Sequence, residues 1–573
     1  MKTALRRPFL LLVAIAALMA ASLGPAISTA SATVAAPAYF VDGKHGSDSN
    51  SGTSPGSAFK TIKAGMWSLR YGGVLDVVGY DDYIYYETIS GSQWFINGSA
   101  SSPIIIRAHG YGSGSYVRPI VSGANVVSRP GQGRWTQPNP ASYPDVWQTP
   151  WTTPIPGYES SVKALRQERV FVDVSQPLVR PLSTTLTSLQ ATPGSQYWDG
   201  ARLYVRLGGW GSTAGASLDP NDHTIEIPTY KGILIASGSR YVQVMGFRIR
   251  HTTMGVGFTG TSQHCLVQEV DASYNYTMGF FTNSSYNTFR AVTGTRNTIQ
   301  LIKLDDGAHH NLVEGVVGTE NMGQGIKLSG ANNYANTVKW STFKGGKDVP
   351  VVQGQYGGYV QGIDIEQGSH GNLIMSNRIE RNRRGLMLYQ MNSSGKALTC
   401  NAIRYNTFVG NNDAVVLWDG KYNSAQGKGA VTFYRNTYVD NIKSVTSEAY
   451  TSGKTFDHET FYRTGTTKAR SHSTFYLKKG SVTVRNSIIR GSAGYHFYAA
   501  SGAKIAVSYT TYWSVGIATR NSSLTVRFGT GVKHLDPGFL SYDSASRDYL
   551  TIGSTSPAYK AGSTGGPVGA RWR

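Results

Sequence analysis

Ionisable side chains recur at matching positions in three short apolar segments near the middle of the chain. The segments read QLIKLDDG (300–307), QGIKLSG (324–330) and QGIDIEQG (361–368). When aligned, they carry charged or polar groups at two positions: Lys303, Lys327 and Asp364 at the first, and Asp305, Ser329 and Glu366 two residues later. Charged groups in such a row can hold the carboxylates of an acidic sugar chain and can transfer protons during its cleavage.

Aromatic and guanidinium side chains follow in the next two aligned segments, RGLMLYQ and DAVVLWDG. Tyr389 and Trp418 occupy the second position there, where flat rings can stack on sugar faces. Arg383 and Arg384 stand at the start of the first of these segments and can either clamp a carboxylate in bidentate fashion or form an ordinary basic turn. Tyr389 can also donate a proton to a leaving oxygen, although a stacking platform is the simpler role.

Alternation of apolar residues predicts that these segments are short β-strands. Successive side chains of a strand point to opposite faces, so two sets are expected to turn inward: Val256, Phe280, Ile302, Ile326, Ile363, Leu386 and Val415, and Phe258, Thr282, Leu304, Leu328, Ile365, Leu388 and Leu417. The charged and aromatic positions would then point outward. Strands stacked ~4.8 Å apart would place Lys303 beside Lys327, where like charges destabilise a sheet, so a functional role is favoured over a merely solvated polar face.

A repeated asparagine predicts how the strands are arranged. It occurs at intervals of 24, 25, 36, 29 and 35 residues, at Asn287, Asn311, Asn336, Asn372, Asn401 and Asn436, with His264 and Tyr241 at the same phase upstream. Short strands at such a period, separated by Gly and Asn, indicate a parallel β-solenoid, and the L-x-x-L-x-L spacing of a leucine-rich repeat is missing. We therefore predict an all-β fold, a right-handed parallel β-helix in which stacked Asn side chains form an internal ladder.

The remaining segments indicate how the chain is divided. Residues 1–32 read as a secretion signal, because a basic start and an apolar stretch precede Ala30-Ser31-Ala32. We expect an N-terminal cap and the first coils in 33–125, with a TI..A capping helix, and an inserted β-rich subdomain in 126–230. The main β-helix and its closing coils would occupy 231–573.

The net charge of the chain indicates which class of molecule it binds. The 573 residues include 54 Lys and Arg against 33 Asp and Glu, a balance of +21, and removal of the signal would leave +18. A basic protein favours anionic partners, and export makes nucleic acid an unsuitable one. No later segment has the length of a membrane span. We therefore predict a secreted, monomeric protein whose partner is an acidic polysaccharide.

The segment GQGIKLSGANNYANTV (323–338) resembles the G-x-G-F-K-L-G-G…N-x-V motif of the family 9 polysaccharide lyases, which include β-helix pectate lyases. The resemblance implies β-elimination on a uronate-containing polymer, with Lys327 as the base that takes the C5 proton. Lys303 and Arg384 would neutralise the substrate carboxylate. The calcium-binding aspartates of the family are replaced here, one coil earlier, by Ile299, Gln300 and Lys303, so no cofactor is clearly encoded and calcium dependence stays open.

The pKa of Lys327 decides whether it can act as a base, since free lysine titrates near ~10.4. The ammonium of Lys303 one rung away would lower this pKa, and the carboxylate of Asp364 on the other side would raise it. The sequence does not decide which effect is larger, and our hypothesis is a secreted enzyme with an alkaline optimum.

Two other functions stay open. A glycoside hydrolase could use Asp305, Asp364 and Glu366, because outward residues two apart on a strand lie ~6.5–7 Å from each other, near the lower end for an inverting pair of carboxylates. A non-catalytic carbohydrate-binding β-helix needs none of these groups for turnover. The identity of the polymer and the choice between internal and terminal cleavage do not follow from the sequence.

The cysteines and paired histidines are expected to be structural. Cys265 and Cys400 lie five coils apart, roughly 24 Å, which is too far for a disulfide, so we predict two free, buried thiols. His309 and His310 are expected to be ordinary turn residues rather than metal ligands.

Overall fold

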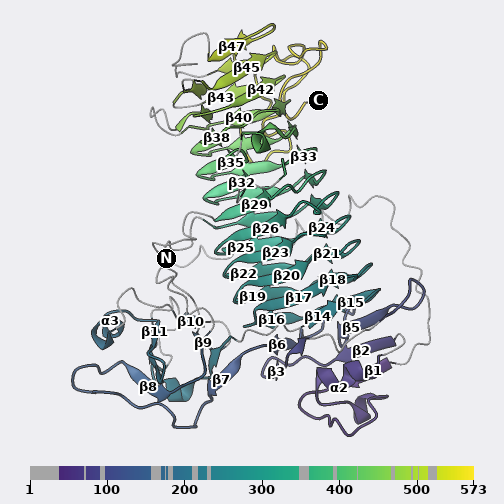
Figure 1. The fold of residues 1–573 in the computed structure, drawn as a ribbon, viewed down its shortest axis with the longest axis vertical. Coiled ribbons are helices and arrows are strands. Elements are labelled where there is room, and N and C mark those ends of the chain that lie inside the picture. Colours follow the sequence, from purple (N-terminus) through teal and green to yellow (C-terminus); the bar gives the residue numbers. More distant parts are fainter. Residues whose placement is uncertain are drawn as a thin grey trace, which may run out of the picture.

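Three long parallel sheets form a β-helix in the computed structural model of the chain (Figure 1). The structure describes residues 38–69, 73–90, 97–155, 170–173, 176–178, 185–208, 217–228, 234–346, 360–390, 396–421, 424–465, 472–491, 494–500, 502–513 and 525–572. Each coil adds one strand to each sheet, and the predicted parallel β-helix with an inserted β-rich subdomain is confirmed. The expected signal segment in 1–32 lies outside the described residues.

The sheet that carries the aligned segments has 12 strands. In their order across the sheet they are β4 (Ile89–Ser90), β14 (Leu234–Ser237), β17 (Met254–Thr259), β20 (Met278–Thr282), β23 (Gln300–Leu304), β26 (Gln324–Ser329), β29 (Gln361–Glu366), β32 (Arg384–Tyr389), β35 (Asp413–Trp418), β38 (Lys443–Ser447), β41 (Phe475–Leu477) and β44 (Phe497–Ala499). We call it the site sheet.

Two further sheets close the coil. One has 15 strands: β1 (Ala38–Val41), β2 (Gly73–Val77), β5 (Ile104–Ala108), β15 (Val242–Met245), β18 (Leu266–Gln268), β21 (Thr288–Arg290), β24 (Leu312–Glu314), β27 (Thr337–Lys339), β30 (Leu373–Met375), β33 (Asn401–Arg404), β36 (Val431–Tyr434), β39 (Lys454–Asp457), β42 (Ser481–Arg485), β45 (Lys504–Ser508) and β47 (Val526–Phe528). The other has 14 strands: β3 (Ile84–Tyr86), β6 (Ile120–Ser122), β16 (Arg248–Arg250), β19 (Asp271–Ser273), β22 (Thr293–Thr295), β25 (Val317–Thr319), β28 (Thr342–Lys344), β31 (Arg378–Glu380), β34 (Thr407–Val409), β37 (Thr437–Val439), β40 (Thr460–Tyr462), β43 (Ile488–Arg490), β46 (Thr511–Trp513) and β48 (Lys533–His534).

A short helix lies at the N-terminal end of the β-helix, as the sequence predicts. It is α2 (Ile62–Trp67), and the hydroxyl of Thr61 accepts a hydrogen bond from the backbone N–H of Ala64, which is the usual role of an N-cap threonine. Ile62 and Met66 are buried against the first coils. The helix thereby covers apolar side chains that would otherwise be exposed at the open end of the solenoid.

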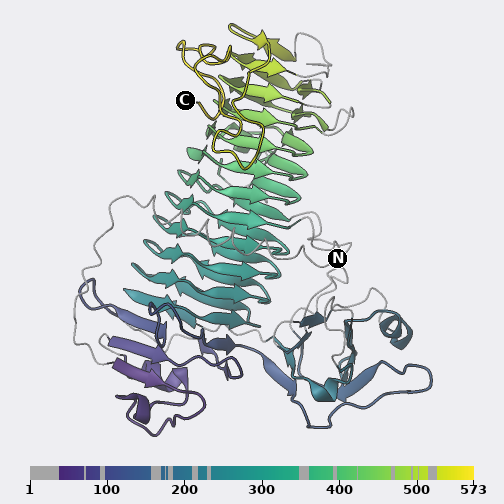
Figure 2. The ribbon, with the colours of Figure 1, turned by 180° about the vertical axis from the view of Figure 1, so that it is seen from behind.

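The inserted subdomain projects sideways from the same end of the β-helix (Figure 2). It consists of two small antiparallel sheets, α3 (Leu186–Gln190) and its own apolar core; the strands are β7 (Asn125–Ser128), β8 (Trp147–Pro150), β9 (Val170–Val172), β10 (Gln176–Leu178), β11 (Ser195–Trp198), β12 (Arg202–Arg206) and β13 (Ile225–Ile227). A buried contact attaches it to the β-helix: Glu226 lies 3.2 Å from His251, whose ring stacks on Phe171 at 4.0 Å.

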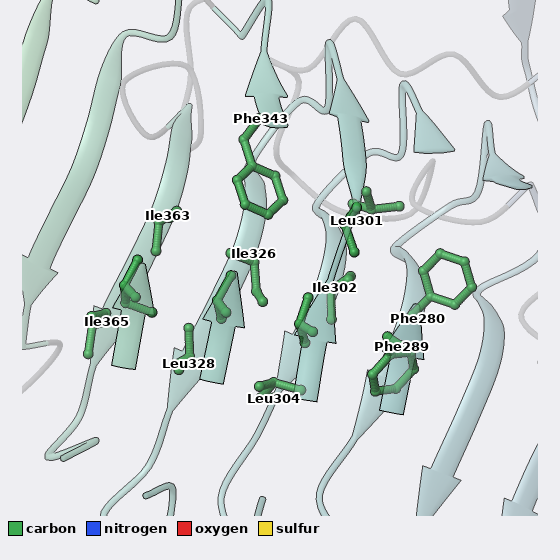
Figure 3. Packing of buried hydrophobic residues seen from close by; sticks show 14 of the residues in the cluster. Phe280, Phe289, Leu301, Ile302, Leu304, Ile326, Leu328, Phe343, Ile363 and Ile365 are labelled. Atoms are coloured by element: carbon green, nitrogen blue, oxygen red, sulfur yellow. The ribbon is translucent and has the colours of Figure 1, made fainter. Parts of the chain in front are cut away.

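Apolar side chains fill the interior in columns. Figure 3 shows Ile302, Ile326 and Ile363 at the same place on successive strands, and every member of the two predicted inward sets is buried. One contiguous apolar cluster extends from the N-terminal cap to β47.

Buried asparagines stack in three separate ladders instead of one. The predicted ladder contains Asn287, Asn311, Asn336, Asn372 and Asn401, where each side-chain oxygen accepts a backbone N–H from the preceding rung. The assignment of Asn436 to it is wrong, because Asn436 follows Asn406 and Asn377 in a second ladder at the next turn. The third comprises Asn275, Asn297 and Asn321, with Asn382, Asn411 and Asn441 farther along.

Two further expectations need correction. Cys265, and not His264, stands at the Asn phase, since its backbone N–H donates to Asn287; His264 and Tyr241 lie one residue earlier, in the left-handed conformation of the turn. Both cysteines are free as predicted, but only Cys265 is buried, whereas Cys400 occupies the exposed left-handed turn position.

Within the described part of the chain, no helix has the length and apolarity needed to cross a bilayer.

Candidate active site

The register of the site sheet brings the predicted chemical groups together. Lys303 pairs with Lys327 and Lys327 with Asp364 across successive strands. Two residues later Ser329 pairs with Glu366, then Glu366 with Tyr389 and Tyr389 with Trp418. These two outward columns are confirmed. They run parallel to the axis of the β-helix, as an extended chain lying on the sheet would.

The outward face is more buried than expected. The relative exposure of both Asp364 and Glu366 is 2%. Met387 and Val416, which continue the first column, are buried as well, although they are no part of the interior apolar cluster. The sequence predicts that these side chains point outward but not that they are buried, and the structure places the carboxyl groups in a desolvated setting where electrostatic interactions are strong.

Glu366 and Lys327 form the ion pair at the centre of the site. The ammonium of Lys327 lies 2.5 Å from Oε1 of Glu366, and the hydroxyl of Ser329 donates a hydrogen bond of 3.0 Å to the same oxygen. Burial lowers the pKa of Lys327, but the carboxyl groups of Glu366 and Asp364 raise it more, so the net shift is upward. The sequence left open whether Lys303 or Asp364 would dominate; in the structure the carboxyl groups on the next rung do, and they raise the pKa of Lys327.

Burial and a neighbouring carboxyl group raise the pKa of Asp364 and so favour its protonated form. Burial raises its pKa first, and repulsion from Glu366 adds to this, while Lys327 and Arg384 oppose it; the result is a pKa of about 8. Oδ1 of Asp364 has no hydrogen-bond partner among the described residues. Since Asp364 and Glu366 are two residues apart on β29, one strand presents a proton donor beside a carboxylate that an ammonium holds in place.

A second, more open ion pair lies on the far side of Lys327. Lys303 and Asp305 are 2.7 Å apart, with side-chain exposures of 23% and 31%. The structure thus gives the two adjacent lysines different partners, which removes the repulsion that two lysines on neighbouring rungs would otherwise have.

Aromatic rings and cations continue the face beyond the carboxyl groups. The rings of Tyr389 and Trp418 lie 6.2 Å apart, and the guanidinium of Arg384 is 4.9 Å from the Trp418 ring. Lys421, which sequence reasoning missed, has its ammonium 5.4 Å from both rings. Lys421 directly follows the last aligned segment, and this position could have identified it from the sequence. Arg383 precedes β32, and burial lowers its pKa.

The family's calcium ligands have no equivalent at the corresponding positions. The side-chain amide of Gln300 donates to the side-chain oxygen of Gln324 at 3.0 Å, and Lys303 places an ammonium where the family has a carboxylate. Ca²⁺ requires six to eight oxygen ligands. These residues do not fit calcium, and within the described ranges no three His, Cys, Asp or Glu side chains cluster as metal ligands would.

Comparison with known proteins gives structural similarities only. No family model and no curated protein sequence matches the chain. Among solved structures, the complex of XylC with xylose is 13% identical, covers 87% of this chain and 86% of its own, and has a TM-score of 0.49. The lacto-N-biosidase of family GH136 from Eubacterium ramulus is 10% identical over 78% and 64% of the two chains, with a TM-score of 0.39. Pectate lyase Pel9A is 15% identical over 60% of this chain and 97% of its own, with a TM-score of 0.36.

Proposed function

We propose that the protein is a secreted glycoside hydrolase acting on an acidic polysaccharide that lies along the site sheet. The observation that carries the proposal is the pair of buried carboxyl groups two residues apart on β29: Asp364, whose Oδ1 has no hydrogen-bond partner among the described residues, and Glu366, which Lys327 contacts. Burial raises the pKa of Asp364 and so favours its protonated form. A pair of carboxyl groups, one acting as an acid and the other as a base, is the machinery of glycosidic cleavage.

In the proposed reaction Asp364 donates its proton to the glycosidic oxygen as the bond to the anomeric carbon breaks. Glu366 accepts a proton from the water that adds to the anomeric carbon, so one water is consumed and two sugar ends are formed. Lys327 and Ser329 orient Glu366 through contacts of 2.5 and 3.0 Å. Because two residues on a strand span ~6.6 Å, we expect an inverting enzyme.

A product assay tests this proposal. The full chain is incubated with pectate, alginate, hyaluronan, chondroitin and heparin, and both reducing ends and near-ultraviolet absorbance are followed. Hydrolysis yields reducing ends without absorbance. Asp364→Asn should lower the rate at least ~100-fold, because general acid catalysis contributes about 10²–10⁴. Asp543→Asn, an exposed carboxyl on the C-terminal segment, is the matched control. An Asp364→Asn enzyme as active as this control would contradict the proposal.

β-Elimination is the second candidate, and the adjacent lysines favour it. Lys303 and Arg384 would neutralise the substrate carboxylate while Lys327 removes the C5 proton. The raised pKa of Lys327 weighs against this role, because a base must first lose its own proton. Unsaturated products absorbing in the near ultraviolet would establish the lyase and exclude the hydrolase. Binding without turnover on every polymer would point to the non-catalytic alternative.

A further inference from the structure

A pocket of about 390 Å³ opens on the site sheet beyond the aromatic rings. Trp418 forms one wall, and Lys421, Glu448, Tyr450 and Lys479 line the rest. Glu448 directly follows β38, so the pocket extends the second outward column past Trp418. Trp418 is two rungs from Glu366, a distance of roughly 10 Å along the axis.

The walls of this pocket are fixed by a buried ion pair. The ammonium of Lys454 lies 2.5 Å from Oδ2 of Asp419, and both side chains have no exposure. Lys454 also donates hydrogen bonds to three backbone oxygens, including those of Gly427 and Gly429, at 3.0 and 2.7 Å. Since Asp419 directly follows Trp418, the pair anchors the segment that carries the aromatic wall. A site held in this way needs little ordering when a ligand binds.

The same segment is joined to the opposite wall by the backbone. Gly420 forms an antiparallel bridge with Tyr450. A Cβ at Gly420 would collide with the carbonyl oxygen of Tyr450, so only glycine allows this approach. The two sides of the pocket are therefore one rigid unit.

Charge in the pocket is positive. Lys421 and Lys479 line it, and both are exposed. Its one acidic group, Glu448, lies 3.1 Å from the ammonium of Lys478, which balances it. The guanidinium of Arg384 adds a further cation near the Trp418 ring. An aromatic wall suits the face of a sugar, and the surplus of cations suits an anionic substituent.

We infer that this pocket is a subsite that binds an anionic sugar unit, carrying a carboxylate or a sulfate, and that its nearest wall, Trp418, lies two rungs from the cleavage point. Trp418 would stack on the ring, and Lys421 and Lys479 would bind the anion. The inference rests on the proposed function only in taking the site sheet as the surface that holds the polysaccharide. According to this inference, the pocket determines the preference for acidic substrates, and the carboxyl groups of β29 do not.

Calorimetric titration of the full-length Asp364→Asn protein tests the subsite without turnover. The probes are tetragalacturonate, a sulfated carrageenan tetrasaccharide without carboxylates, and neutral xylotetraose. We expect one of the two anionic probes to bind at least ~10-fold more tightly than xylotetraose. Adding Lys421→Gln and Lys479→Gln should weaken that binding by about 10–100-fold, which is about 1.4–2.8 kcal/mol at 1.4 kcal/mol per tenfold change. The stronger probe identifies the anion as carboxylate or sulfate.

The control is Lys533→Gln, which removes an exposed charge from β48 on another sheet and should leave the affinity unchanged. Equal affinity of the parent and the double lysine variant, or no binding of either anionic probe, would overturn the inference. These outcomes are separate from the failure of the proposed function, which would appear as unaltered activity of Asp364→Asn. Binding retained by an enzyme that proves to be a lyase would leave the subsite standing.

Discussion

Two kinds of polar column run along the same β-helix, and they differ in how their hydrogen bonds are completed. Asn336 accepts from the backbone and side-chain N–H groups of Asn311, and donates to Ala308 and Asn372. Asp364 is equally buried, but its Oδ1 has no such partner among the described residues. The ladder repeats one residue type and satisfies its hydrogen bonds, whereas the outward column with Asp364 mixes lysine, aspartate and apolar side chains and leaves a buried carboxyl incompletely bonded.

The completed hydrogen bonds of the asparagine ladder indicate a structural role, and the incomplete bonding of Asp364 indicates a role in chemistry. A repeated amide can be both donor and acceptor, so each rung satisfies the next and the stack stabilises the coil. A carboxyl group that lacks such partners costs stability, and buried groups of this kind are concentrated at functional sites. Substitutions in the ladder should therefore change stability, and substitutions on β29 should change activity.

The largest expected effect is on catalysis. Glu366→Gln keeps the shape and can still accept the bond from Ser329, but it cannot take a proton from water. We expect kcat to fall by about 10²–10⁴ with little change in the far-ultraviolet circular dichroism spectrum. Asn336→Ala, assayed at a temperature where it is folded, should keep its kcat within a factor of about two. Similar losses in both variants would mean that the two columns are not distinct.

Removal of Lys327 should cost the most stability. Lys327→Met leaves the buried carboxylate of Glu366 without its partner, and breaking a buried pair from one side typically costs about 3–5 kcal/mol. The double variant Lys327→Met with Glu366→Gln should recover part of the lost melting temperature, since it leaves no unpaired charge. Scanning calorimetry measures both melting temperatures. If the single variant melts at the same temperature as the double variant, the ion pair does not contribute to stability.

A ladder residue should cost somewhat less. Asn336→Ala leaves the buried backbone N–H of Asn311 without an acceptor, at about 1–3 kcal/mol. The side-chain amide of Asn311 keeps its bond to Ser284 and loses one bond, worth about 1 kcal/mol, so we expect a total loss of about 2–4 kcal/mol. Asn332→Ala, only four residues away, removes an exposed bond to Asp306 and should lower the melting temperature far less. Equal melting temperatures for the two variants would contradict the role assigned to the ladder.

The pH response distinguishes the two mechanisms by sign. Asp364 must be protonated to act as an acid, so hydrolysis should fall tenfold per unit as pH rises above about 8, whereas a lysine base would make the rate increase in that range. The titration of Asp364 also makes stability depend on pH. The folded state keeps a proton on Asp364 that the unfolded chain releases near pH 3.8. The free energy of unfolding should therefore decrease as pH rises from about 4 to about 8. Asp364→Asn should lack that decrease, which thermal melts across the pH range would detect.

The sequence was sufficient for the architecture because each coil obeys a local rule. Alternation placed Ile302, Ile326 and Ile363 in one column, and the register of Lys303, Lys327 and Asp364 followed from the alignment. The assignment of Asn436 failed because two asparagines of one coil can occupy different turns, and spacing alone does not separate them. Burial of Asp364 could not be predicted either, since alternation gives the direction of a side chain and not what covers it. The pairing of Lys327 with Glu366 depends on a diagonal contact between rungs, which no repeat pattern specifies.

The smallest effect should come from the other lysine. Lys303 and Lys327 are the same residue type on adjacent rungs, but Lys303 pairs with the more exposed Asp305, and exposed pairs are worth about 0–1 kcal/mol. Lys303→Met should therefore lower stability by less than about 1 kcal/mol, well below the cost of Lys327→Met. Under hydrolysis it should act mainly through KM for an acidic polymer, because its charge is near the chain but not at the cleaved bond. A collapse of kcat in Lys303→Met, with KM unchanged, would instead place this ammonium at the reacting atoms and return the lysines to the centre of the mechanism.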